Sequence, residues 1–188
     1  MTERQHYDVL RRYPGFELRH YPAHLVAEVE VDSSFTDAGN RAFGMLAGYI
    51  SGRNGTTSKV AMTAPVVQES ASSRIAMTAP VVQEPGTDPG RHVVAFVMPA
   101  GYSLETLPAP TDPRVSLREV GSQTAAARSF TGRWSERIYR DQLAALSSAI
   151  EQAGLEITGP ARFARFDPPW TPWFRRHNEV VIPVADES

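Results

Sequence analysis

The sequence predicts an α+β fold in which two helices pack on one curved antiparallel sheet. Three observations predict it: segments of alternating polar and apolar residues recur along the 188 residues, two longer segments have helical periodicity, and the order strand, strand, helix, strand, strand occurs twice. We expect one domain over 1–188, made of two β-β-α-β-β halves, at about 7–107 and 114–184, related by a pseudo-twofold axis. The proline-rich stretch 108–113 is expected to join the halves.

Several segments have the two-residue alternation of a strand. The clearest is 24–32, where Leu25, Ala27, Val29 and Val31 fall on one face and acidic residues fall on the other. Weaker strand patterns occur at 7–12, 16–20, 93–98, 115–120, 124–130, 162–166 and 179–184.

Two segments carry apolar residues at helical spacing. The first is predicted over 35–51, because Ser34 and Asp37 have the spacing of a capping box at its start. The second is predicted over about 136–153, with Ser135 as its N-cap. Each should turn its apolar stripe toward the sheet.

An exact internal repeat lies between the first helix and the next strands. The nine residues AMTAPVVQE at 61–69 recur at 76–84. Two copies are too few for a solenoid, so we expect neighbouring β segments of one sheet, joined by a turn at 70–73. Pro65 and Pro80 cannot donate to a β ladder and should mark bulges or edges.

Composition excludes several classes of function. Acidic residues number 21 and basic residues 19, which disfavours a nucleic-acid partner. Without cysteine, the chain has no disulfide, iron–sulfur cluster, zinc–thiolate site or cysteine nucleophile. No apolar run approaches the ~20 residues that span a bilayer, and the N-terminus lacks a signal-peptide core. We therefore expect a soluble, cytoplasmic protein with no membrane partner.

A stiff aromatic loop near the C-terminus is the clearest candidate for a binding surface. Residues 168–174 contain three prolines, two tryptophans and a phenylalanine, and Arg175, Arg176 and His177 follow. Such a loop makes a good wall for a flat apolar ligand, because it has little conformational entropy left to lose. Arginines beside it could bind ligand carboxylates. The same residues could equally be a proline-rich connection that caps the core.

Four motifs, taken in order, resemble the SOUL/haem-binding protein family. They are YxVxRxY at 7–13, YIxGxN at 49–54, KVAMTAPV at 59–66, and PPWTP followed by NEVxIP within 168–183. The resemblance spans nearly the whole chain. It implies a distorted antiparallel β-barrel flanked by two helices and built from two repeats. It also implies that this barrel binds haem or another tetrapyrrole non-covalently, in an apolar groove between the first helix and the proline-rich loop.

The resemblance also implies the residues of the groove. Its walls would be one helix face and the loop, formed by Asn40, Phe43, Ala47, Trp170, Thr171, Pro172 and Trp173. Relatives can place basic residues on both walls, whereas several of these positions are neutral here. The haem propionates would then pair with Arg41, Arg175 or Arg176, and His177 could ligate the haem iron or meet a propionate.

The expected function is to buffer, carry or deliver haem, with a protein partner that receives it. One alternative is a small-molecule effector-binding domain with hydrolase-type activity, which would need a Glu or Tyr general base. Tyr49, Tyr139 and Glu179 are available for that role, and no motif supports any of them as catalytic. Another alternative is a protein-interaction module that uses the aromatic loop.

Overall fold

The computed structural model describes residues 3–55, 73–86, 88, 90–167 and 170–186. The elements in chain order are β1 (Glu3–Arg4), β2 (Asp8–Tyr13), β3 (Phe16–Tyr21), β4 (His24–Asp32), α1 (Phe35–Ile50), β5 (Asn54–Gly55), β6 (Thr78–Ala79), β7 (Val81–Pro85), β8 (Arg91–Val97), β9 (Ala109–Pro110), β10 (Ser116–Val120), β11 (Gln123–Thr131), α2 (Glu136–Gln152), β12 (Arg162–Arg165), the 3-10 helix η1 (Trp173–Arg175) and β13 (His177–Pro183).

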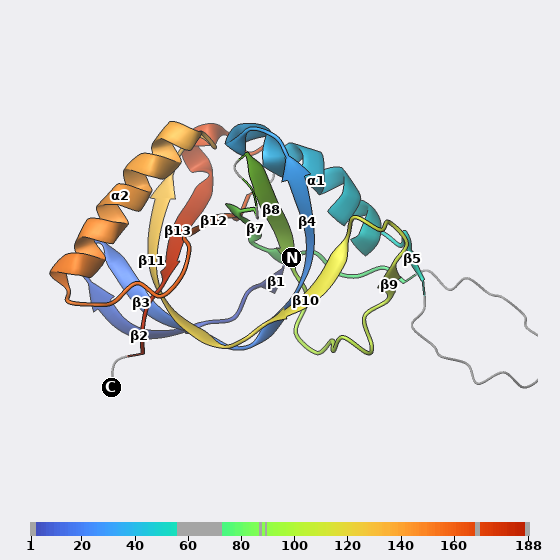
Figure 1. Cartoon of the computed structure of the whole chain (residues 1–188), viewed down its shortest axis with the longest axis horizontal. Coiled ribbons are helices and arrows are strands. Elements are labelled where there is room, and N and C mark those ends of the chain that lie inside the picture. The colour runs from blue at the N-terminus through green and yellow to red at the C-terminus, as the bar shows by residue number, and fades with distance from the viewer. Residues whose placement is uncertain (1–2, 56–72, 87, 89, 168–169, 187–188) are drawn as a thin grey trace, which may run out of the picture.

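Nine of the strands form one curled sheet. Its order is β10-β4-β8-β7-β12-β13-β11-β3-β2, and every pairing within it is antiparallel. The sheet is an open half-barrel with β10 and β2 at its edges, and both helices lie over one of its faces (Figure 1). The predicted α+β fold with a barrel-like sheet and two flanking helices is thereby confirmed. We call the face turned away from the helices the inner face.

The two predicted β-β-α-β-β units are present and exchange their first strands. One unit is β3-β4-α1-β7-β8 and the other is β10-β11-α2-β12-β13. Strand β3 pairs with β11 of the second unit, and β10 pairs with β4 of the first. By their place in the two units, β3 corresponds to β10, β4 to β11, β7 to β12 and β8 to β13. Exchanging each strand for its counterpart reverses the order of the sheet from β10 to β3, as a pseudo-twofold axis requires. The units therefore meet at a central seam, where β7 pairs with β12.

Both helices begin at the predicted caps. The Asp37 backbone N–H donates to the Ser34 hydroxyl at 3.2 Å, and that hydroxyl donates to the Asp37 carboxylate at 2.8 Å. The Ile138 N–H donates to Ser135 Oγ at 3.4 Å at the start of α2. Gly52 follows α1 with a φ of 110°, a left-handed conformation that glycine adopts without strain.

Each helix buries its apolar stripe against its own half of the sheet. Leu46 and Tyr49 of α1 pack on β4 and β8, and Leu146 and Ile150 of α2 pack on β11 and β13 (Figure 1). Both clusters lie on one curved antiparallel sheet, as the sequence predicts, and they share one side of it. In the described part of the chain, no helix is long and apolar enough to cross a membrane.

The duplicated segment contributes only its second copy to the described structure. Thr78–Ala79 of that copy forms β6, and residues 81–84 lie in β7; Pro80 separates the two strands, as expected of a residue that cannot donate. The first copy, Pro65 and most of the proposed turn lie outside the described residues. The 108–113 stretch joins the two units as predicted, but it also forms β9, which pairs with β5.

Leu146→Ala tests the packing of α2. Leu146 is fully buried, so the truncation should lower the free energy of unfolding by about 2–5 kcal/mol. Urea unfolding of the ligand-free protein measures the change. Leu104→Ala, at an exposed leucine, is the matched control and should change it by less than about 0.5 kcal/mol. Equal effects of the two substitutions would contradict the packing of α2 on the sheet.

Candidate functional site

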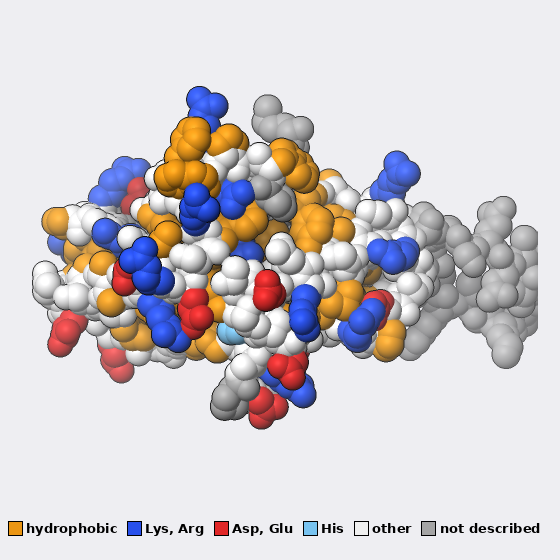
Figure 2. Space-filling view, turned by 90° about the horizontal axis from the view of Figure 1, so that it is seen from above, with side chains coloured by type: hydrophobic (Ala, Val, Ile, Leu, Met, Phe, Trp, Pro, Cys, Tyr) orange, Lys and Arg blue, Asp and Glu red, His pale blue; other side chains and the backbone are white. Residues whose placement is uncertain are grey.

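An apolar cavity of about 280 Å³ lies at the seam, on the helix side of the sheet. Helix α1 forms one wall, β6 and β7 form the floor, and the segments that flank α2 and follow β12 form the other wall. Hydrophobic side chains with basic side chains around them gather near the middle of this face (Figure 2). The lining residues are Gly39, Asn40, Phe43, Met77, Ala79, Val81, Trp134, Arg165, Phe166, Asp167 and Trp170.

Three of the sequence-predicted site residues meet in this cavity. Asn40 and Phe43 lie one turn apart on α1, and Trp170 lies on the opposite wall. Phe43 is held by an edge-to-face contact with the buried ring of Phe96, with centroids 5.6 Å apart. Asn40 and Phe43 come from the helix face that the family resemblance implies, and the loop contributes its first tryptophan.

The remaining predicted residues do not line the cavity. Arg41 is exposed and donates to the Asp32 carbonyl at 3.1 Å, beside a different, open hollow. The ring of Trp173 contacts Phe174 and lies under the guanidinium of Arg133. The others outside the cavity wall are Ala47, Thr171, Pro172, Arg175 and Arg176.

Arg176 acts on the site indirectly. Its Nε donates to the Thr171 carbonyl at 2.8 Å, and its guanidinium lies over the ring of Trp134, 4.3 Å from the ring centroid. It therefore fixes the aromatic loop to the wall of the cavity.

Sequence reasoning missed Trp134 and Arg165. Trp134 immediately precedes the N-cap of α2, and its indole N–H donates to the side chain of Asn178 at 2.8 Å. Arg165 ends β12 and is only 6% exposed. Its Nη2 donates to Gln83 Oε1 at 2.8 Å, and its guanidinium lies 5.1 Å from the rings of both Trp134 and Phe163. The available signal was a basic residue inside a short apolar strand pattern.

His177 lies on the other face of the sheet. Along β13, Asn178 points to Trp134 on the helix side, so His177 and Glu179 point to the inner face. The imidazole Nε2 lies 3.3 Å from Glu179 Oε1, and the ring contacts Phe166. His177 is therefore not among the residues that line the cavity.

A buried ion pair dominates the inner face. Arg19 of β3 and Glu179 of β13 form a two-pronged pair, with nitrogen–oxygen distances of 2.8 and 3.0 Å. Burial alone would raise the pKa of Glu179, but hydrogen bonds from His177, Arg19 and Ser129 and the positive charge of Arg19 lower it to about 2. Glu179 is therefore ionised and already occupied by protein partners.

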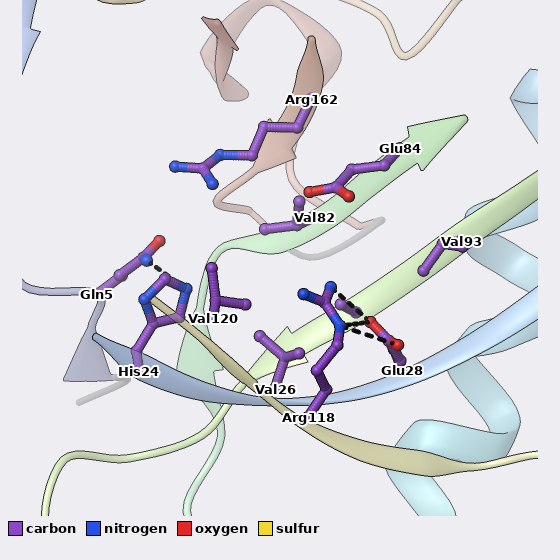
Figure 3. Close-up of a pocket in the computed structure, with 11 residues that line it drawn as sticks. Gln5, His24, Val26, Glu28, Val82, Glu84, Val93, Arg118, Val120 and Arg162 are labelled. Atoms are coloured by element: carbon purple, nitrogen blue, oxygen red, sulfur yellow. Dashed lines mark hydrogen bonds and ion pairs between the residues drawn. The ribbon is translucent and has the colours of Figure 1, made fainter. Parts of the chain in front are cut away.

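A second pocket on the inner face is too small for a flat ligand. Arg118 forms an ion pair with Glu28 in it, Gln5 contacts His24, and Arg162 points in from β12 (Figure 3). Its volume of about 20 Å³ suits about one water molecule.

The three candidate general bases do not converge on one site. The Tyr49 hydroxyl donates to the Pro108 carbonyl at 2.8 Å, and the ring of Tyr139, a residue of α2, stacks on Phe35. Burial raises the pKa of both tyrosines to about 12. Glu179 lies on the inner face, paired with Arg19. None of the three lines the cavity at the seam.

The family model of the SOUL heme-binding protein matches residues 2–73 and 67–183. The chain belongs to the SOUL heme-binding protein family. The two matched ranges overlap at 67–73, which includes the last three residues of the first copy of the duplicated nonapeptide.

Relatives and solved structures support the same fold. The chain is similar to Heme-binding protein 2 of Mus musculus (27% identical) and of Homo sapiens (28%), over 146 residues that cover 75% of this chain and 64% of each relative. The fold resembles the EcmrR C-terminal domain (TM-score 0.63, 11% identity, covering 96% and 99% of the two chains) and a hydrolase from Listeria innocua (0.58, 14%, 94% and 94%). At these identities, the likeness to solved structures shows the fold of this SOUL protein alone.

Glu179→Gln tests the buried pair of this SOUL domain. The free energy of unfolding at pH 7 should fall by about 3–5 kcal/mol, because Arg19 stays buried without its main partner. The pKa of Glu179 falls from 4.5 to about 2 on folding, so the wild type holds this stability above pH 4.5 and loses it as the pH drops toward 2.

Urea unfolding across pH 2 to 7 measures both effects. Glu151→Gln, at an exposed position of α2, is the control and should leave the pH profile unchanged. If Glu179→Gln and the wild type lost stability equally between pH 4.5 and 2, the pair would not stabilise the fold.

Proposed function

We propose that this protein, as a single domain over residues 1–188, binds haem or a related tetrapyrrole non-covalently in the cavity at the seam. Membership of the SOUL heme-binding protein family supports the ligand class. The proposed place of binding rests on one observation, the apolar cavity between Phe43 of α1 and Trp170, because the helix and the loop that were implied as groove walls both line it. The proposed role is to buffer, carry or deliver the tetrapyrrole.

The lining suits a flat apolar ligand. Phe43, Trp134, Phe166 and Trp170 offer aromatic surface, and apolar contact is worth roughly 25 cal/mol per Å² before association costs. A volume of about 280 Å³ is at the small end of ligand pockets, so part of a macrocycle would stay outside. A partly exposed ligand suits a protein that must release its cargo.

Bound haem would supply a redox-active iron, and the lining residues would hold the macrocycle around it. Of the described lining residues, none is a histidine, and Met77 carries the sole sulfur. His177, which could have ligated the iron or met a propionate, points to the inner face, so the proposal gives it neither role. The protein should therefore bind porphyrin with and without iron in the same way.

A protein-interaction role is supported by the exposed aromatic loop. Trp170 is 82% exposed, and Trp173 and Phe174 are exposed beside it. Solvent-exposed aromatic clusters are typical of interaction surfaces. Since Trp170 also lines the cavity, a protein partner that receives haem could dock on this loop and reach the ligand.

The double variant Phe43→Ala, Trp170→Ala tests the site. Both rings line the cavity, so their loss should weaken binding of hemin and of iron-free protoporphyrin IX alike, by at least about tenfold. Titration followed by the Soret absorbance measures both affinities.

Two further variants make this test selective. Phe174→Ala removes an exposed aromatic ring outside the cavity and should leave both affinities unchanged. His177→Ala should also leave the ratio of the two affinities unchanged. Tight hemin binding that survives the double variant would place the site elsewhere, and no saturable porphyrin binding by the wild type would refute the function.

A further inference from the structure

The wall of the cavity contains a buried cation that no carboxylate of the described chain neutralises. Arg165 is 6% exposed, and its Nη2 bonds to the neutral amide of Gln83. Its Nε is buried and has no hydrogen-bond acceptor. Among the described residues, no acidic side chain lies within ion-pair distance of it.

Arg19, another buried arginine of the same sheet, has the carboxylate partners that Arg165 lacks within the described chain. Arg19 is 3% exposed and has carboxylate partners in both Glu17 and Glu179. Buried charges in proteins are normally paired in this way, because an isolated charge loses its hydration without compensation. Arg165 has instead the faces of two aromatic rings, which compensate less than an anion does.

The electrostatics of the cavity favour an incoming anion. Burial, together with the positive charge of Arg176, lowers the pKa of Arg165 to about 10, so the guanidinium is still charged at neutral pH. The carboxylate of Asp167 lines the same cavity, but it accepts the backbone N–H of His177 at 2.6 Å. Arg165 is therefore the cation of this wall, with the charge of Arg176 behind it, and the acidic residue that lines the cavity is hydrogen-bonded to the backbone of β13.

The fold also brings α1 directly onto this guanidinium. A Cβ placed on Gly39 would collide with Arg165 Nη1. Glycine at this position leaves the guanidinium room to lie against the helix, and a larger residue would displace it. The position of Arg165 at the wall thus depends on a second residue that is 126 positions away in the sequence.

We propose that Arg165 binds a carboxylate of the ligand, so that the cavity selects acidic tetrapyrroles over their neutral esters. The inference rests on the proposed function and adds the chemical feature by which the site distinguishes its ligands. A guanidinium presents parallel N–H donors that match a carboxylate, and burial strengthens such a charge-assisted pair. The aromatic lining then binds the macrocycle, while Arg165 determines which edge enters.

The test compares protoporphyrin IX with its dimethyl ester, both in the same non-ionic detergent below its micellar concentration. The two molecules share the macrocycle and differ in their negative charges. The wild type should bind the diacid about 10- to 100-fold more tightly than the ester, as expected for a hydrogen-bonded ion pair. Arg165→Met should reduce the affinity for the diacid to that for the ester and leave the ester affinity unchanged.

A matched control comes from the same strand. Arg162 is 7% exposed and also lies in β12, but it points to the inner face. Arg162→Met therefore removes an equally buried arginine and should keep the preference for the diacid. Gly39→Ala displaces the Arg165 guanidinium without removing it, so it should lower the preference for the diacid over the ester. This variant replaces Arg165→Met in the test if Arg165→Met does not fold.

The outcomes separate this inference from the proposed function. Equal wild-type affinities for diacid and ester, or an equal loss of both in Arg165→Met, would overturn the role of Arg165 while porphyrin binding itself stood. A preference for the diacid that is lost in Arg162→Met and kept in Arg165→Met would move the anion site to the inner face. No binding of either porphyrin to the wild type would overturn both proposals.

Discussion

The exchange of first strands between the two units determines the rest of the architecture. Because β3 is hydrogen-bonded to β11 and β10 to β4, each unit completes its sheet with a strand from the other. The units are therefore held in one continuous sheet, with β7 against β12 at its centre. Each helix covers its own unit, and the seam between the helices is left for the cavity. The position of the site follows from this pairing rather than from any one motif.

Strand β12 separates two different electrostatic environments. On its inner face, Arg162 lies over the ring of Tyr21, near the ion pair of Arg19 and Glu179, and its Nη2 is buried without a hydrogen-bond partner among the described residues. On its helix side, Arg165 meets aromatic rings, an amide and an open cavity. The two buried arginines of this short strand therefore differ in the space beside them, because Arg165 adjoins the cavity of about 280 Å³ and Arg162 adjoins pockets of about 20 and 10 Å³.

Local features of this fold could be predicted from the sequence, whereas features made by distant segments could not. The caps at Ser34 and Ser135 and the main strands follow from spacing within a few residues, and the helix wall at Phe43 follows from one helix face. The other wall joins Trp134, Arg165 and Trp170, which the antiparallel pairing of β11 and β12 with β13 brings together. Arg165 was missed for a further reason: alternation normally places a charged residue outside, and this one is buried.

The strand exchange also bears on how such a chain arose and how it is made. Two separate copies of one unit could pair by donating their first strands to each other, which is the arrangement of a domain-swapped homodimer. The present chain has the topology of such a dimer after gene duplication and fusion. During synthesis, β3 cannot pair with β11 until the second unit has been made, because Leu18 lies opposite Ala126. The nascent first unit therefore carries an uncovered sheet edge. Strand pairing between segments so far apart in the sequence slows folding, and the unpaired edge is prone to aggregation until β11 covers it.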